Sequence, residues 1–169
     1  GLFTQLGDFA RNSLGRIKAD GTVLVRDIVA GTSSSGPADL SALGSSVFFA
    51  ANDAVKGSEL WKSDGTVGST VLVKDIVVGA ASSSPASLTT MGGTLFFTAT
   101  DAANGRELWK SDGTDTGTVL VKDIVAGAAG SAPANLTVVG STLFFTATDA
   151  TNGTELWKSD GTVGGTVLV

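Results

Sequence analysis

The sequence predicts an all-β fold made of repeated four-stranded antiparallel sheets, and three observations support this prediction. The first is a period of 48 residues, marked by the only three tryptophans of the chain, Trp61, Trp109 and Trp157. The second is that each period contains four short β-prone runs separated by turn residues. The third is that apolar residues in these runs are consecutive, as in Leu95, Phe96 and Phe97. Because successive strand side chains point to opposite faces, both faces of each sheet must be covered.

The last unit of the chain shows the four strand signals in order. They lie at residues 135–139, 142–148, 154–159 and 166–169. Short turn segments separate the first three, and Asp160-Gly161 follows the third. This dipeptide favours a tight hairpin because both residues tolerate a positive φ. The links between units are longer, as in residues 125–134, where Pro133 blocks early strand pairing.

Four meandering strands per unit and two covered faces favour a β-propeller-type array of antiparallel blades. The predicted units are a degenerate partial blade at 1–28, blades at 29–76 and 77–124, and a blade at 125–169 that is truncated at its last strand, all in one repeat domain. The alternative is a β-solenoid or a fibrillar stacked-sheet array, because runs such as Thr118 to Val121 are β-prone and uncharged. Solenoid coils are usually shorter and lack three hairpin turns per repeat.

The incomplete first unit also bears on assembly. A propeller ring must close, because an open end leaves apolar residues in water. The sequence therefore predicts that the chain does not persist as a closed monomer. Its expected partners are other copies of itself or further repeats of a longer chain, with a glycan or a surface protein as a further possibility.

One eight-residue motif, Glu-Leu-Trp-Lys-Ser-Asp-Gly-Thr, occurs three times, at residues 59–66, 107–114 and 155–162. We expect its tryptophans to be packing anchors between blades, since they lie in mid-strand next to leucine, although exposed tryptophans would be able to stack on sugars. The Asp-Gly pairs are expected to be structural turns. The predicted structural anchors are Trp61, Trp109, Trp157, Asp64, Gly65, Asp112, Gly113, Asp160 and Gly161.

This motif, followed by Gly-Thr-Val-Leu-Val-Lys-Asp-Ile and preceded by Leu-Phe-Phe-Thr-Ala-Thr-Asp, resembles the ELWxxDGT repeat proteins of bacteria. The match covers residues 21–169 closely and residues 1–20 weakly. The resemblance implies secreted or cell-surface chains with many tandem, propeller-like blades, and it implies no defined activity. The sequence departs from the pattern in the first unit, where Ile17 stands at the tryptophan position, and at Lys56, where the other copies have Asn104 and Asn152.

The composition excludes several classes of function. The net charge of −5, with charges of both signs interspersed, gives no electrostatic reason to bind nucleic acid. The apolar runs are strand-sized, so no membrane insertion is expected. The chain has no His, Cys or Tyr, which removes the usual catalytic triads and thiolate metal sites.

These exclusions favour a binding or structural module that is not an enzyme. Two carboxylates such as Glu107 and Asp112 would be able to hydrolyse glycosides, so a glycan-binding or glycoside-hydrolysing propeller stays an alternative. However, the same carboxylates recur in every unit, whereas a single active site requires that the symmetry be broken. A self-assembling fibrillar structural protein is the other alternative.

Calcium is the one cofactor that the sequence suggests. Around each Asn-Gly turn, three side chains carry the oxygen ligands that calcium prefers. They are Asp101, Asn104 and Glu107 in one unit and Asp149, Asn152 and Glu155 in the next. The competing interpretation, which we favour, is a plain Asn-Gly hairpin, because such turns need no metal.

Overall fold

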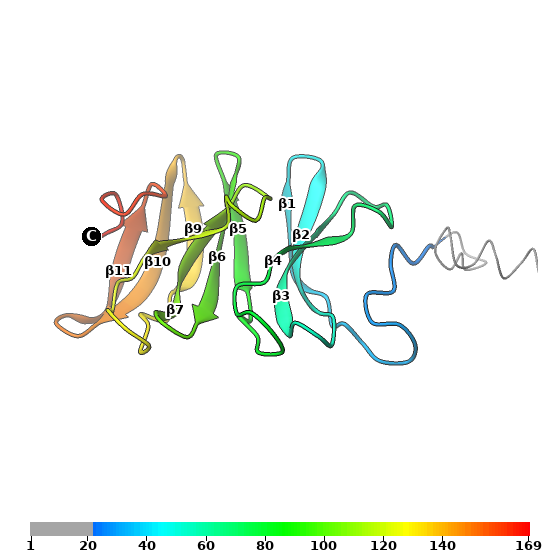
Figure 1. Cartoon of the computed structure of the whole chain (residues 1–169). Coiled ribbons are helices and arrows are strands. Elements are labelled where there is room, and N and C mark those ends of the chain that lie inside the picture. The colour runs from blue at the N-terminus through cyan, green and yellow to red at the C-terminus, as the bar shows by residue number, and fades with distance from the viewer. Residues whose placement is uncertain (1–21) are drawn as a thin grey trace, which may run out of the picture.

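The computed structural model describes residues 22–169, which form strands, turns and loops but no helix (Figure 1). The first sheet consists of β1 Ala38–Leu43, β2 Ser46–Asn52, β3 Ser58–Ser63 and β4 Val71–Lys74. The second sheet consists of β5 Ala86–Met91, β6 Thr94–Asp101, β7 Gly105–Ser111 and β8 Val119–Lys122. The third sheet consists of β9 Ala134–Val139, β10 Thr142–Asp149, β11 Gly153–Ser159 and β12 Val167–Leu168.

Each sheet is an antiparallel meander, because strands that follow one another in the chain are also neighbours in the sheet. The prediction of an all-β fold with four-stranded antiparallel sheets is therefore confirmed. The three sheets fall within the predicted units 29–76, 77–124 and 125–169. Most of the predicted partial blade at 1–28 lies outside the described residues.

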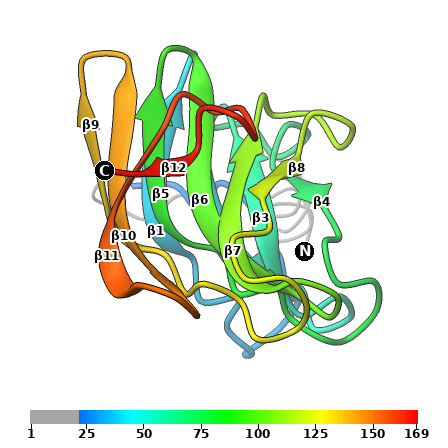
Figure 2. The same cartoon turned by 90° about the vertical axis from the view of Figure 1, so that its left-hand side faces the viewer.

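The sheets stack in a row, with the first sheet at one end and the third at the other (Figure 1). Figure 2 looks along this row from the third sheet and shows the other two behind it. Over residues 22–169 the row does not close into a ring. Among the described sheets, only the middle one packs against another four-stranded sheet on both of its faces.

Strand register divides the apolar residues between the two faces of a sheet. In the middle sheet, Trp109 on β7 lies opposite Phe97 on β6 and Leu120 on β8. Residues opposite each other in an antiparallel pair share a face, and all three pack toward the first sheet. Phe96 and Leu108, one position away on their strands, pack toward the third sheet. The consecutive apolar residues of the sequence are explained by this two-sided burial.

The segment before β1 covers the outer face of the first sheet (Figure 1). Ile28 packs there against Phe49, Ala51 and Trp61. The Arg26 guanidinium donates to the backbone oxygen of Thr70 over 2.7 Å. These contacts give residues 22–28 the place that a fourth strand of a preceding sheet would take.

The Asp-Gly turns differ from the predicted tight hairpin. Strand β7 ends at Ser111 and β8 begins at Val119, so Asp112 and Gly113 open a loop of residues 112–118. The loop is longer because polar side chains close it internally. The Ser111 and Thr118 hydroxyls are 2.7 Å apart at its base, and Thr118 also donates to the backbone oxygen of Thr114 over 2.6 Å. Asp20-Gly21, the corresponding pair of the first unit, lies outside the described residues.

Candidate functional site: the repeated junction between sheets

The interior of the molecule consists of the junctions between successive sheets. At the first junction, Phe48, Leu60 and Val73 of the first sheet pack against residues of the second. Those residues are Leu95, Phe97, Ala99 and Trp109. The second junction repeats this arrangement 48 residues later, from Phe96, Leu108 and Val121 to Leu143, Phe145, Ala147 and Trp157. One packing scheme therefore serves both junctions.

All three tryptophans are buried in these layers. Trp109 and Trp157 are 7% exposed and Trp61 is 6% exposed. Each faces the preceding part of the chain, with Trp61 lying under Ile28. Fully buried aromatic rings contribute mainly through the apolar area they remove from water. These three indoles therefore hold sheets together and present no platform on which a sugar could stack.

A buried carboxylate fastens each link between units. The Glu107 carboxylate accepts hydrogen bonds from the Ser131 backbone N–H at 2.7 Å, from the Ser131 hydroxyl at 2.5 Å and from the Val125 N–H at 3.3 Å. Glu59 makes the equivalent bonds with Ser83, at 2.8 and 2.6 Å, and accepts from the Ile76 N–H at 3.1 Å, one position before the counterpart of Val125. Each glutamate thus ties both ends of the following link to the start of its own strand.

Burial controls the electrostatics of these two glutamates. Both Glu59 and Glu107 are 0% exposed. Burial raises the pKa of each carboxyl above its ordinary value of 4.5, because a charge is poorly solvated there, and the hydrogen bonds from serine only partly oppose the shift. The carboxylates are fully engaged with protein donors, so they act as structural fasteners.

Lysines cross each junction to backbone oxygens of the next unit. The Lys62 ammonium donates to the Gly113 oxygen over 2.7 Å, and Lys110 donates to the Gly161 oxygen over 2.8 Å. These two glycines also lie against a phenylalanine of the preceding sheet. A Cβ placed on Gly113 would lie 3.0 Å from Cζ of Phe48, and the contact recurs at 3.0 Å between Gly161 and Phe96. The Asp-Gly loop is therefore a docking surface for the sheet before it.

The aspartates of these loops serve the loop itself. Asp112 accepts hydrogen bonds from the Thr114 hydroxyl at 2.7 Å and from the Thr114 N–H at 2.8 Å. These bonds lower the pKa of Asp112, and the pKa of Asp160 is lowered in the same way by Thr162. Asp64, whose pKa is also lowered, accepts from Ser69 and Thr66. Gly113 adopts a φ of +90°, and Gly65 and Gly161 have similar values.

The suggested calcium ligands are placed as follows. Asp101 accepts hydrogen bonds from the Ala103 and Asn104 backbone N–H groups and from the Asn104 side-chain amide, at 2.6 to 2.8 Å. Asp149 and Asn152 repeat this arrangement, which lowers the pKa of Asp149. The turn brings Asp and Asn together, but Glu107 bonds to Ser131 instead.

Glu155 is the exposed member of the glutamate series. Within residues 22–169, no group of three or more acidic, histidine or cysteine side chains is arranged to hold a metal ion. Calcium binding stays the alternative to a plain Asn-Gly hairpin at these turns.

Sequence reasoning missed the serine and lysine partners of the junction. Ser83 and Ser131 recur at the 48-residue period together with Ser35, and Lys62 recurs as Lys110 and Lys158. This periodicity was a usable signal. The periodicity does not show which side chains bond to each other, because nothing in the sequence indicates that Glu107 bonds to a serine 24 residues further on.

Comparison with protein-family models, with curated proteins and with solved structures finds no match to this chain. In the part of the chain that the structure describes, no helix is long and apolar enough to cross a bilayer.

Proposed function

We propose that this chain is a non-catalytic repeat module of the β-propeller type that serves binding or structural assembly outside the cell or at its surface. The observation that carries the proposal is the repetition of one junction. The carboxylate, lysine and phenylalanine contacts between the first two sheets recur between the second and the third. A junction that repeats in this way lets any unit accept a further one, which is the property of a repeat array.

The chemistry of the junction supports a module without catalysis. The glutamates that a glycosidase mechanism would use, such as Glu107, are buried and bonded to the backbone and hydroxyl of a link serine. A glycosidase also needs two carboxyl groups that both face a substrate. The buried tryptophans likewise give no support to the glycan-binding alternative.

The sheet topology supports the propeller type. Each sheet is a four-stranded meander, and the link after β8 leads from the last strand of one sheet to the first strand of the next. Propeller blades are connected in this way. The resemblance of the repeated motif to the ELWxxDGT repeat proteins supports a secreted or surface-associated location.

A fibrillar structural array is the second candidate, and the open row of sheets favours it. Over residues 22–169 the sheets follow one another without closing (Figure 1). Serial stacking of such sheets through the same junction would produce a growing assembly.

A comparison of the chain with its Glu107→Gln variant tests the absence of catalysis. We expect no hydrolysis of aryl glycosides by either protein and a lower melting temperature for the variant, because a buried acceptor is lost. We also expect that the chain binds none of the glycans on a glycan array. Hydrolysis that disappears in Glu107→Gln while the melting temperature stays unchanged would replace this proposal with a glycosidase.

A further inference from the structure

The third sheet exposes a face that is buried twice elsewhere in the molecule. Leu60 and Leu108 are 0% exposed at the two junctions, whereas Leu156, at the same position of the third sheet, is 46% exposed. Val169, the counterpart of the buried Val73 and Val121, is 65% exposed. A groove of about 380 Å³ runs over this face. It is lined by Asn152, Glu155, Leu156, Leu168 and Val169.

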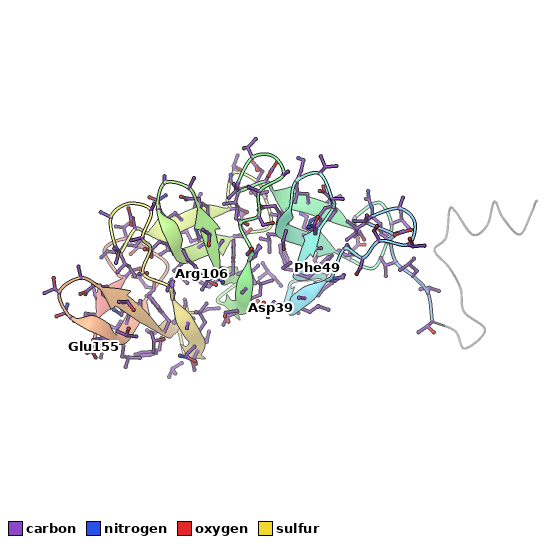
Figure 3. All side chains as sticks on the ribbon, turned by 90° about the horizontal axis from the view of Figure 1, so that it is seen from below. Asp39, Phe49, Arg106 and Glu155 are labelled. Atoms are coloured by element: carbon purple, nitrogen blue, oxygen red, sulfur yellow. The ribbon has the colours of Figure 1, made fainter. Side chains whose placement is uncertain are left out.

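Glu155 is the uncovered member of the glutamate series. Figure 3 shows it at the end of the row, away from the other sheets. Glu59 and Glu107 are 0% exposed and each accepts two hydrogen bonds from a link serine. Glu155 is exposed, and among residues 22–169 no hydrogen bond to it is formed. Glu155 of the third sheet thus corresponds to Glu59 and Glu107, but within residues 22–169 no link segment lies against it.

A link segment of the kind that binds Glu59 and Glu107 lies at the opposite end of the molecule, before β1. Ser35 occupies the position of Ser83 and Ser131 in the repeat. Its backbone oxygen accepts from the Asn52 N–H at 2.8 Å, as those of Ser83 and Ser131 accept from Thr100 and Thr148 at 2.8 and 2.9 Å. The turn that begins the link is also the same, with Gly31 N–H donating to Asp27 at 3.4 Å and Gly127 N–H donating to Asp123 at 3.4 Å. The segment before β1 therefore already has the conformation of the two links whose serines donate hydrogen bonds to Glu59 and Glu107.

The Asp-Gly loops show the same complementarity. Gly113 and Gly161 each lie against a phenylalanine of the preceding sheet, whereas a Cβ on Gly65 would have no atom within 4 Å. Phe144, the counterpart of Phe48 and Phe96, belongs to the third sheet, whose outer face packs against no other sheet within residues 22–169. An open glycine at one end of the row thus matches an unpaired phenylalanine at the other.

From these matched ends we infer that two copies of this chain dock head to tail, with the third sheet of one on the first sheet of the other. Glu155 of one copy accepts hydrogen bonds from the N–H and hydroxyl of Ser35 in the second copy. Phe144 packs on Gly65 and Lys158 donates to the Gly65 oxygen of that copy, as Phe48 and Lys62 do on Gly113. This inference rests on the proposed function as a repeat module, and it names the partner and the contacts.

Residues 22–25 of the second copy complete this junction as its fourth strand. They read Thr-Val-Leu-Val, identical to residues 166–169. In a single copy β12 holds this place: Val167 and Leu168 pair with β11, and the Val169 N–H donates to the Leu156 oxygen over 3.0 Å. The segment from the second copy also continues to Ile28, whose counterparts Ile76 and Ile124 pack into the two internal junctions. Residues 22–25 of the second copy therefore replace β12 beside β11.

Sedimentation velocity over a concentration series tests the inference with two variants, Glu155→Gln and Ser35→Ala. Neither side chain makes a hydrogen bond within residues 22–169, so both variants keep the fold of the monomer. The unmodified chain is expected to associate as its concentration rises, because every copy carries both ends of the contact and head-to-tail contacts produce closed rings or open rows. Each variant should weaken association by about tenfold or more, since a charge-assisted hydrogen bond is lost.

Mixing the variants gives the decisive result. In an equimolar mixture, Glu155 of the Ser35→Ala protein meets Ser35 of the Glu155→Gln protein, so one intact junction forms. We expect dimers of unmodified affinity that do not grow further. The control is Ser33→Ala, which lies in the same link where the other units have Ala81 and Ala129, and it should assemble like the unmodified chain.

A chain that stays monomeric at all concentrations overturns the inference, and so does association that neither variant weakens or that mixing does not restore. Association that neither variant weakens would be expected if the exposed face bound another apolar partner without using Ser35. The proposed function is judged separately by Glu107→Gln, whose side chain lies in an internal junction, so failure of one proposal does not imply failure of the other.

Discussion

The indole of Trp109 fills the space between the first two sheets, where it packs with Phe97 and Leu60. It is 7% exposed. We predict that Trp109→Ala lowers the free energy of unfolding by about 3 to 5 kcal/mol, because the lost apolar burial is compounded by a cavity that a sheet junction cannot easily collapse. Chemical denaturation followed by circular dichroism measures this loss.

Two controls separate packing from other causes. Trp109→Phe keeps most of the apolar ring and should cost clearly less than the alanine variant. Val78→Ala, at a site that is 88% exposed, should leave the free energy of unfolding nearly unchanged. A loss below about 1 kcal/mol for Trp109→Ala would contradict the burial of this side chain.

Glu107 has a different role, because its buried carboxylate must satisfy several donors at once. Glu107→Gln removes one acceptor oxygen from the Ser131 and Val125 donors. We predict a loss of about 1 to 3 kcal/mol in the free energy of unfolding near neutral pH, the usual cost of unpaired buried donors. The matched control is Glu155→Gln, in which the same change falls on an exposed, unbonded carboxylate and should have no effect on the monomer.

The pH dependence of this loss follows from the raised pKa of Glu107. Between its ordinary value of 4.5 and its folded-state value, the folded protein binds the proton more tightly than the unfolded chain. The contribution of Glu107 to stability is therefore complete below 4.5 and is lost as the pH rises through the folded-state pKa. Denaturation at a series of pH values should show the gap between the unmodified chain and Glu107→Gln widening as the pH falls. A gap that narrows on acidification would contradict the sign of the shift.

The Asp-Gly loop shows how a turn element and a junction depend on each other. Gly113 and Gly65 have φ values of +90° and +94°, so alanine is strained at both positions. Only Gly113 also touches a phenylalanine ring, since a Cβ there would lie 3.0 Å from Phe48. We predict that Gly113→Ala destabilises the monomer by about 1 kcal/mol more than Gly65→Ala, because the ring must shift. Thermal and chemical unfolding at low protein concentration give both values, and equal losses would show that backbone strain is the whole effect.

At the scale of elements, the strands could be predicted and one class of turn could not. The runs around Trp157 gave the third unit's strands to within one or two residues, because β-prone apolar runs and glycine-rich breaks mark their ends. The Asp-Gly pair was interpreted as a tight hairpin turn, yet it opens a loop of residues 112–118. Side-chain bonds such as those of Thr118 to Ser111 and to the Thr114 backbone decide that loop, and local dipeptide preference does not reveal them.

The candidate site shows the same division. The burial of the tryptophans could be predicted, because they lie in mid-strand in a sheet that is apolar on both faces. The role of Glu107 did not follow, since its nearness to Asp101 and Asn104 suggested a calcium loop. The structure places its carboxylate on the Ser131 link instead. Such a contact depends on the path of the link beneath the sheet, which is a property of the stacked units and not of any one strand.

At the scale of the whole molecule, the row of sheets has one fully covered member and two unequal ends. The first sheet has its outer face covered by Ile28 and its neighbours. Within residues 22–169 no segment covers the outer face of the third sheet in this way, and Leu156, Leu168 and Val169 are exposed on it. In arrays whose units contact only their neighbours, stability is the sum of unit terms and junction terms. The third sheet gains from one junction only, so it is the least stable of the three.

Native-state hydrogen exchange should resolve this gradient. We predict that amides in β6 and β7, which lie between two junctions, exchange only through global unfolding, whereas amides in β10 and β11 exchange through a lower-energy opening of the third sheet. Exchange measured by mass spectrometry at low protein concentration tests the order. Head-to-tail docking adds a second expectation, because raising the concentration should then slow exchange in β11 in the unmodified chain but not in Glu155→Gln. Uniform protection across the three sheets would contradict the additive view, since it would mean that the row unfolds as one cooperative unit.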